Sequence, residues 1–242
     1  MIVFVLFLIW GFPAVGAFAP PATAGSRFPP QPEGTASTST VLSIGQLLSD
    51  FLPTTKASSA IDPQRVEEVK REIIALAEGT SNGISASDQK RNQISQLVTE
   101  LEAVNPTRDL TNSPMLDGSW KLIYTTNGGS SAGKLGPFVG EVEQLICIEG
   151  REVGEQDYYN FVRIAGGAVE GALRATWDVL AKDKWQVNFE SVRFSVLGVT
   201  LVEKDLSAVG VWRMTYLDDD FRILYASGGR NIPKENIYIL AK

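Results

Sequence analysis

The stretch Leu116-Asp-Gly-Ser-Trp-Lys-Leu-Ile-Tyr-Thr-Thr126 decides the fold, because targeting and helical patterns precede it and strand patterns follow it. It begins with a turn at Asp117-Gly118 and then alternates, so Trp120, Leu122 and Tyr124 are expected on one face. Such alternation is typical of a half-buried antiparallel strand. We therefore expect a β-barrel or sandwich to start here.

Short alternating runs separated by glycines and turn pairs continue from this stretch to the C-terminus. They predict strands near 118–126, 140–149, 157–165, 169–181, 184–194, 199–205, 208–217, 220–226 and 236–241. Eight or nine strands are enough to close a barrel, and an eight-stranded barrel can hold one small ligand. We expect a mainly β fold with an antiparallel barrel over 116–242.

Large side chains are expected to point into this barrel. The set comprises Trp120, Tyr124, Phe161, Trp177, Trp185, Val187, Phe189, Trp212 and Tyr216. Two interpretations are open: the aromatic rings simply fill the core, or they leave room for an apolar ligand. The candidate ligand-lining residues are Tyr124, Phe161, Trp177, Phe189, Trp212 and Tyr216.

Two amphipathic helices are expected in a helical segment over 61–115. The first spans 63–78 after the cap Asp62, and the second begins near Ser85 and ends at Asn105, before Pro106. Their apolar faces require a partner. They either pack on each other and plug or flank the barrel, or they offer a surface to a membrane or a partner protein.

The N-terminus has the pattern of a targeting sequence. Ile2–Phe12 is apolar and is followed by small residues, which predicts a signal peptide over 1–17, although no basic residue precedes the apolar run. Residues 18–60 are rich in Pro, Ser, Thr and Ala in their first half and are expected to form a transit peptide or disordered linker. Phe18 after the cleavage point resembles the bipartite plastid leader of algae with secondary red plastids.

Composition excludes several kinds of chemistry. The chain has no histidine and one cysteine, so His-based acid–base catalysis, Ser-His-Asp triads and His/Cys zinc sites are not available to it. The net charge is −6 and the sequence contains no run of basic residues, which argues against nucleic-acid binding. We expect no cofactor, no metal and no catalytic residue, and a buried, inert Cys147.

Two motifs resemble parts of functional sites, but the residues around them do not complete such a site. Gly128-Gly-Ser-Ser-Ala-Gly-Lys134 matches part of a P-loop, but Leu135 replaces the Ser or Thr that holds Mg²⁺, so we expect a Gly/Ser loop near the barrel mouth. Asp218-Asp219-Asp220 is expected to be a hairpin turn in which one carboxylate accepts hydrogen bonds from turn amides.

Several motifs together resemble the plastid lipid-associated protein (fibrillin) family. They are Leu101-Glu-Ala-Val-Asn-Pro-Thr107, the opening stretch with Gly118 and Trp120, Glu143-Gln144, Thr215-Tyr-Leu-Asp-Asp-Asp-Phe-Arg-Ile223 and the terminal Ile237-Tyr-Ile-Leu-Ala-Lys242. The resemblance covers about 63–242. It implies a lipocalin-like barrel domain over 61–242, in which Gly118, Trp120, Asp218 and Arg222 are structural. By analogy with lipocalins, the Arg222 guanidinium is expected to stack on Trp120.

The resemblance also implies a function and a subcellular location. It implies a non-enzymatic plastid protein of plastoglobules, thylakoids or stroma that binds or partitions a lipid, isoprenoid quinone or carotenoid. One alternative is a coat or scaffold that docks on plastoglobules or on a biosynthetic enzyme. Another is a lipocalin-type enzyme, which would need paired carboxylates inside the barrel, with Glu141, Glu143 and Glu170 as candidates.

Overall fold

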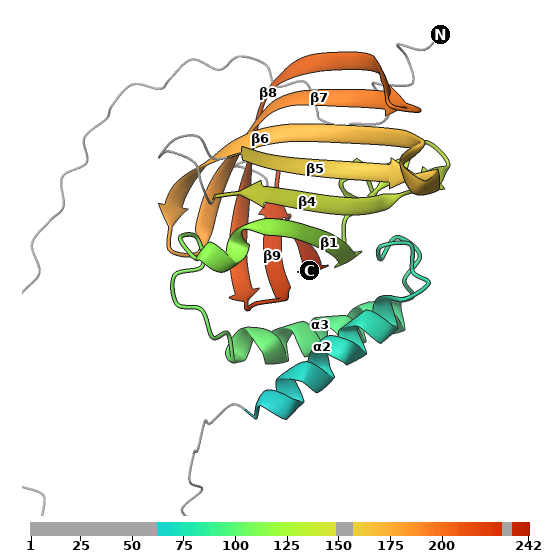
Figure 1. Ribbon diagram of the computed structural model, residues 1–242. Coiled ribbons are helices and arrows are strands. Elements are labelled where there is room, and N and C mark those ends of the chain that lie inside the picture. The colour runs from blue at the N-terminus through green and yellow to red at the C-terminus, as the bar shows by residue number, and fades with distance from the viewer. Residues whose placement is uncertain (1–61, 149–156, 229–233) are drawn as a thin grey trace, which may run out of the picture. The chain divides into compact units, whose positions relative to one another are not determined.

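The computed structural model describes residues 62–148, 157–228 and 234–242. The expected signal peptide and transit peptide lie outside the described residues. Strand β1 (Gly118–Thr125) starts a sheet that closes on itself in the order β1-β10-β9-β8-β7-β6-β5-β4 (Figure 1). The other strands are β4 (Glu141–Cys147), β5 (Asp157–Ile164), β6 (Val169–Ala181), β7 (Lys184–Val196), β8 (Val199–Leu217), β9 (Phe221–Ser227) and β10 (Asn236–Ala241).

The predicted mainly β fold with a closed antiparallel barrel is confirmed. Two details of the prediction were wrong. The runs 199–205 and 208–217 form the single strand β8, which contains a pairing irregularity around Leu206 instead of a turn. A small hairpin of β2 (Lys134–Leu135) and β3 (Phe138–Val139), preceded by the 3-10 helix η2 (Ser130–Ala132), lies where we predicted a Gly/Ser loop and no strand.

The two helices form close to where the sequence places them. Helix α2 (Pro63–Ala77) has Asp62 as its N-cap, with its carboxylate accepting from the Gln64 amide. Helix α3 (Asp88–Ala103) begins three residues after Ser85, with Ser87 as its N-cap, since the Ser87 side chain accepts from the Lys90 amide. Both helices lie along one side of the barrel, as Figure 1 shows.

Two β-bulges decide which side chains face the helices. The pairing of β1 with β10 shifts between Leu122 and Tyr124, and that of β8 with β9 shifts between Met214 and Tyr216. An extra residue in one strand interrupts the regular alternation of side chains between the two faces. Leu122 and Met214 therefore belong to the interior core, whereas Tyr124 and Tyr216 belong to the cluster beneath the helices.

The cluster beneath the helices covers part of the barrel's outer surface. We call this part, formed by β1, β10, β9 and the C-terminal half of β8, the helix-covered quadrant. Its core contains Val69, Ile73, Ala77, Ala86, Ile94, Leu97, Val98, Leu101, Tyr124, Tyr216, Phe221, Ile223 and Ile239. The helices thus flank the barrel, and their main apolar faces are buried against each other and the sheet.

An ion-paired cluster fixes α2 to the β8–β9 turn. The Lys70 ammonium lies 2.6 Å from an Asp218 oxygen, 2.8 Å from Asp220 and 2.8 Å from Glu67. The side chain of Lys70 is only 8% exposed. The Tyr216 hydroxyl donates to Asp218 at 2.6 Å, so one carboxylate links a helix to a strand.

Among the residues described, no helix is both long and apolar enough to span a bilayer.

Candidate ligand site inside the barrel

The barrel has two distinct ends. The β6–β7 and β8–β9 turns lie at one end, where the 3-10 helix η1 (Pro114–Leu116) packs Leu116 into the interior core; we call this the closed end. The β5–β6 and β7–β8 turns lie at the opposite end, which we call the open end. The side chains that line the interior differ between the two ends.

Indole rings occupy the closed half of the interior. The rings of Trp177 and Trp185 stack with centroids 4.5 Å apart, and Trp185 and Trp212 follow at 6.5 Å. Tyr158 meets Trp212 edge-on at 4.9 Å. These side chains are buried members of one core cluster, so Trp177 and Trp212 contribute to packing of the closed half. That packing supports the core-filling interpretation for these two of the proposed ligand-lining residues.

Arg222 is a fully buried cation near the closed end. Its guanidinium carbon lies 4.9 Å from the centroid of Trp120, which confirms the expected stacking, and it donates to the Gln144 amide oxygen at 2.5 Å. Its Nε and Nη1 atoms have no hydrogen-bond partner in the described part of the chain. Burial lowers the pKa of Arg222 to about 10, so the group remains charged at neutral pH.

Lys242 completes the surroundings of Trp120. Its ammonium lies 4.7 Å from the Trp120 centroid and donates to the Met115 carbonyl at 2.9 Å. The Trp120 indole N–H donates to the Leu116 carbonyl at 2.8 Å. Trp120 therefore anchors η1 and two cations at the closed end, which is consistent with the structural role proposed for this residue and Arg222.

The open half of the interior has a different wall. Strands β7 and β8 extend beyond β9, since β8 pairs with β9 only from Val211 onward. On the inward side of this extension lie Phe189, Val192, Phe194 and Val202, all only half-buried, together with the exposed Lys204, which pairs with Val192. We call the four apolar residues the inner wall. Partly exposed apolar side chains on a concave surface are what an apolar ligand would cover.

The Gly/Ser loop lies at the open end. Leu135 of β2 joins the interior core and approaches Gly171 of β6, and Ala132 is completely buried. Asn82 holds the loop from the helix side by donating to the Ala132 and Gly140 carbonyls, each at 2.9 Å. The loop therefore covers part of the barrel mouth beside the inner wall, where the sequence had suggested it could lie.

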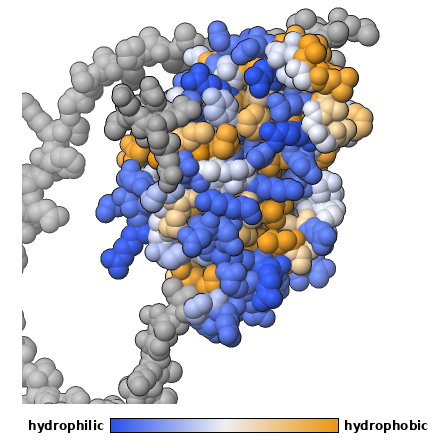
Figure 2. All heavy atoms as spheres, viewed as in Figure 1, coloured by the Kyte–Doolittle hydropathy of each residue, from blue (hydrophilic) through white to orange (hydrophobic). Residues whose placement is uncertain are grey.

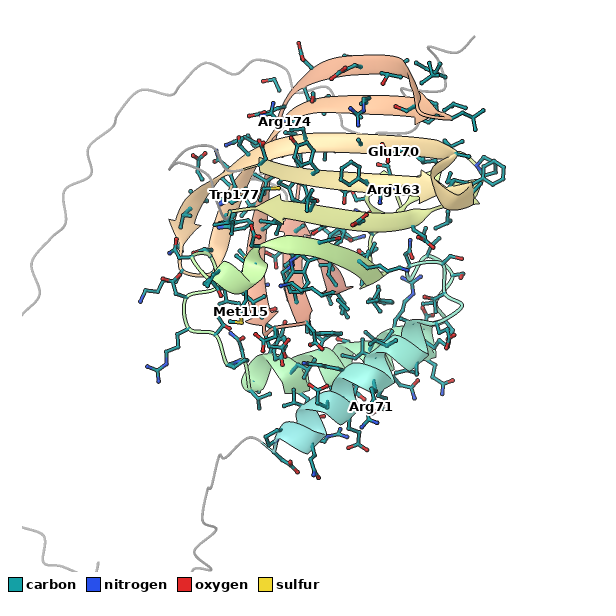
Figure 3. The ribbon with its side chains drawn as sticks, viewed as in Figure 1. Arg71, Met115, Arg163, Glu170, Arg174 and Trp177 are labelled. Carbon is teal, nitrogen blue, oxygen red and sulfur yellow. The ribbon has the colours of Figure 1, made fainter. Side chains whose placement is uncertain are left out.

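The outer face of β4, β5 and β6 carries ion-paired side chains. Arg163 pairs with Glu143 and, at 3.0 Å, with Glu170, and its guanidinium carbon lies 4.6 Å from the Phe161 centroid. Figure 3 shows Arg163, Glu170 and Arg174 on this face. Phe161 therefore lies outside the barrel, contrary to expectation. The carboxylates considered for an enzyme, Glu141, Glu143 and Glu170, also lie on this outer face.

A groove of about 230 Å³ continues along the same outer face. Its lining comprises Tyr159, Ala172, Leu173, Arg174, Ser191, Arg193 and Glu203. Both arginines are already near carboxylates, Arg174 at 3.0 Å from Asp157 and Arg193 at 3.7 Å from Glu170. An anion would have to compete with these pairs, so the groove is a weak candidate for a binding site.

Other expected features have clear positions. Tyr124 and Tyr216, predicted to line the interior, instead lie beneath the helices because of the two bulges. Asp218 accepts from the Asp220 and Phe221 amides at 3.2 and 2.8 Å, as expected for the turn. Cys147 is half-buried on β4 and less enclosed than expected.

Sequence reasoning missed most of the inner wall. Among the six candidates, only Phe189 belongs to it, whereas Val192, Phe194 and Val202 were not proposed. The missed signal was the unequal length of the strands: β6, β7 and β8 have 13, 13 and 19 residues, and β9 and β10 have 7 and 6. Long strands beside short ones leave part of a barrel wall without a facing neighbour.

The fold and the interior define a class of protein. It is a small closed antiparallel barrel with a helix-covered quadrant, an aromatic closed half and an apolar inner wall at the open end. A match to the PAP_fibrillin family model extends over residues 67–232. The chain belongs to this family, as its motifs had suggested.

Relatives of the chain include proteins of higher plants. The chain is 29% identical to "Probable plastid-lipid-associated protein 5, chloroplastic" of Arabidopsis thaliana over 168 residues, covering 68% of each chain. It is 30% identical to "Chromoplast-specific carotenoid-associated protein C1, chromoplastic" of an Oncidium hybrid cultivar, covering 52% of this chain and 40% of the relative. It is 34% identical to "Plastoglobulin-1, chloroplastic" of Pisum sativum over 76 residues, covering 31% and 21%.

Proposed function

We propose that this protein is a plastid lipid-associated protein that holds an apolar molecule, such as a lipid, isoprenoid quinone or carotenoid, against the inner wall of its barrel. The observation that carries the proposal is the inner wall itself: Phe189, Val192, Phe194 and Val202 face inward but remain half-exposed. Covering such surface with an apolar molecule is favourable by about 25 cal/mol per Å². The names of the relatives, which include lipid-associated, carotenoid-associated and plastoglobulin proteins, support the same class of ligand.

The proposed site differs from the one expected from sequence. The indoles of the closed half set the depth to which a ligand enters, and Leu135 with the Gly/Ser loop restricts access from the open end. The ligand therefore inserts one apolar end at the inner wall and is not engulfed by the whole barrel. No reacting group is required for this function, so we propose a binding protein and not an enzyme.

The test compares the same substitution on the two faces of one strand. Val202→Asp places a carboxylate on the inner wall, whereas Val209→Asp places it on the outer face of β8, where Val209 is 43% exposed. Titration of the full chain with a short-chain quinone, followed by quenching of tryptophan fluorescence, should give saturable binding. We expect Val202→Asp to weaken binding by about tenfold or more, because an apolar ligand would desolvate the charge, and Val209→Asp to leave it unchanged.

A coat or scaffold role is the second candidate function. The observation that favours it is the mutual packing of Trp177, Trp185 and Trp212, which leaves the closed half to structural use. In that case neither a quinone nor a fluorescent fatty acid would bind saturably to the wild-type chain. That result would contradict the ligand-binding proposal and favour docking on plastoglobules or on a biosynthetic enzyme.

A further inference from the structure

Three connections at the open end are apolar and carry no charge. They are residues 135–140 around the β2–β3 hairpin, 164–169 between β5 and β6, and 196–202 between β7 and β8. Pairing places them next to one another along the rim: Ile164 pairs with Val169, Val169 with Val196, and Val196 with Val199. Gly140, which follows β3, lies against the Arg163 backbone. The three segments therefore form one continuous rim.

Large apolar side chains project from this rim into solvent. The exposed fractions are 79% for Leu197, 63% for Val199, 60% for Phe138, 55% for Leu201 and 36% for Val139. Figure 2 shows hydrophobic atoms gathered at the end of the molecule that carries the β7–β8 turn. Isolated exposed apolar residues are normal on protein surfaces, but a cluster on adjacent turns marks an interaction site.

The opposite end is more charged, although Val179 and Leu180 near it are 48% and 47% exposed. Its described turns carry charges: Asp117 precedes β1, Lys182-Asp183 joins β6 to β7, and Asp218-Asp219-Asp220 joins β8 to β9. The contrast is a property of whole ends and not of single residues. The protein is therefore polarised along the barrel axis, with its apolar end at the mouth beside the inner wall.

We propose that the rim formed by 135–140, 164–169 and 196–202 inserts into the surface of a lipid phase with uncharged headgroups, so that the barrel mouth faces the lipid. The shape favours lipid over a protein partner, because separate projecting turns fit a deformable phase, whereas a rigid partner would need a matching hole for each. Leu197 adopts φ +50°, a left-handed conformation in a tight turn, so its outward position is built into the backbone.

Charge behind the rim limits the depth of insertion. Arg163 and Arg193 lie within a few residues of the tips, and both pair with Glu170 along the outer face. Because these two arginines are already paired with a carboxylate, they offer little net attraction to an anionic surface. Binding to lipid should therefore depend on apolar contact and persist at high salt.

This orientation rests in part on the proposed function, because it places the inner wall where an apolar ligand could pass from lipid to barrel without crossing water. The two ideas nevertheless fail independently. Docking is measured on vesicles with no added ligand, whereas ligand binding is measured in solution with no vesicles. Absence of docking with intact quinone binding would overturn only the proposed insertion of the rim.

The experiment uses the full chain and vesicles of uncharged phosphatidylcholine. A triple variant, Phe138→Ser, Leu197→Asn and Leu201→Thr, removes the projecting groups; asparagine tolerates the left-handed turn and threonine suits a strand. We expect flotation with vesicles to weaken by about tenfold or more. The matched control is Val179→Ser with Leu180→Ser, which removes side chains 48% and 47% exposed near the closed end and should bind like wild type.

A fluorescent label tests the orientation separately from any other lipid-binding segment of the chain. In a Cys147→Ser background, an environment-sensitive dye is attached to Leu197→Cys or, as control, to Val179→Cys. We expect vesicles to shift and intensify the emission only from position 197. The proposal is overturned if the dye at 197 stays in water, if the triple variant floats like wild type, or if both sets of substitutions reduce flotation equally.

Discussion

At the scale of single residues, Asp218 connects helix, strand and turn. Burial alone raises the pKa of its carboxyl group, but the hydrogen bonds from Lys70 and Tyr216 outweigh burial and lower that pKa. Burial and the hydrogen bond to Asp218 both raise the pKa of the Tyr216 hydroxyl. A carboxylate with three kinds of donor around it stabilises the fold mainly in its ionised form.

Asp218→Asn tests this role through its pH dependence. The variant keeps the turn but loses the charge, and since Lys70 still contacts Asp220 and Glu67, we expect it to unfold more easily by about 2 kcal/mol at neutral pH. Because the folded pKa lies below the unfolded value of about 3.9, the wild-type advantage is complete above that value and is lost as pH falls through the folded pKa. Urea titrations from neutral to acidic pH measure the difference.

A constant difference between the two proteins down to acidic pH would contradict this account. Asp219→Asn is the matched control, because Asp219 occupies the same turn and has no ion pair among those described. It should change the free energy of unfolding by less than about 0.5 kcal/mol.

Single residues also show what sequence could and could not predict. The stacking of Arg222 on Trp120 followed from motifs that resemble a family, and the structure confirms it. The inward position of Tyr124 followed from strict alternation and was wrong, because a bulge after Leu122 reverses the face. A bulge is one extra residue in a strand, and nothing in local composition distinguishes it from regular strand.

At the scale of elements, the connection between α2 and α3 docks directly on β1. The Thr125 amide donates to the Asn82 carbonyl at 2.9 Å, and Gly83 follows with φ +96°. A Cβ atom at Gly83 would lie 2.3 Å from the Thr125 carbonyl oxygen and 2.9 Å from the Tyr124 ring. This close approach requires glycine, so the connection is part of the helix-covered quadrant and not a free loop.

Gly83→Ala should therefore be strongly destabilising. We expect a loss of about 3 kcal/mol, because both the backbone conformation and a fixed carbonyl oppose the methyl group. Gly79→Ala is the control: Gly79 also has positive φ, +72°, but nothing lies within 4 Å of its Cβ position. Its loss should be about 1 kcal/mol, from backbone strain alone. Equal losses in thermal or urea unfolding would show that the close approach at Gly83 does not matter.

Elements were easier to predict from sequence than their contacts. Capping residues, periodicity and prolines placed both helices within a few residues of their observed bounds. Which barrel strands they cover depended on long-range pairing, and two interpretations of their apolar faces remained open. Of the predicted ligand-lining residues, Tyr124 and Tyr216 were misplaced because of the two bulges. Val192, Phe194 and Val202 were missed because strand overhang depends on the register of neighbouring strands and not on any one segment.

At the scale of the whole molecule, burial is unevenly distributed around the barrel. Strands β9 and β10 have paired neighbours on both sides, interior core on one face and helices on the other. The N-terminal half of β8 pairs only with β7 among the described strands, and most of its side chains are exposed. Local opening should therefore cost much less free energy in this half of β8 than in β10.

Hydrogen exchange of the full chain measures this difference. We expect amides of β10 (Asn236–Ala241) to exchange most slowly and amides between Val199 and Leu206 to exchange at least about tenfold faster, since their opening breaks fewer contacts. The C-terminal half of β8, from Val211 to Leu217, is the internal control and should behave like β10. Uniform protection along β8 would contradict the uneven distribution of stability.

The unpaired edge of β8 also affects how copies of the protein associate with one another. From Val199 to Gly210, one side of the strand meets no other strand in the described parts of the chain. Free edges of this kind can recruit strands from other copies and seed aggregation. The consecutive charges Glu203-Lys204-Asp205 lie near the middle of this edge, where like strands stacking in register would bring equal charges together. These charges should therefore disfavour growth of in-register assemblies from this edge.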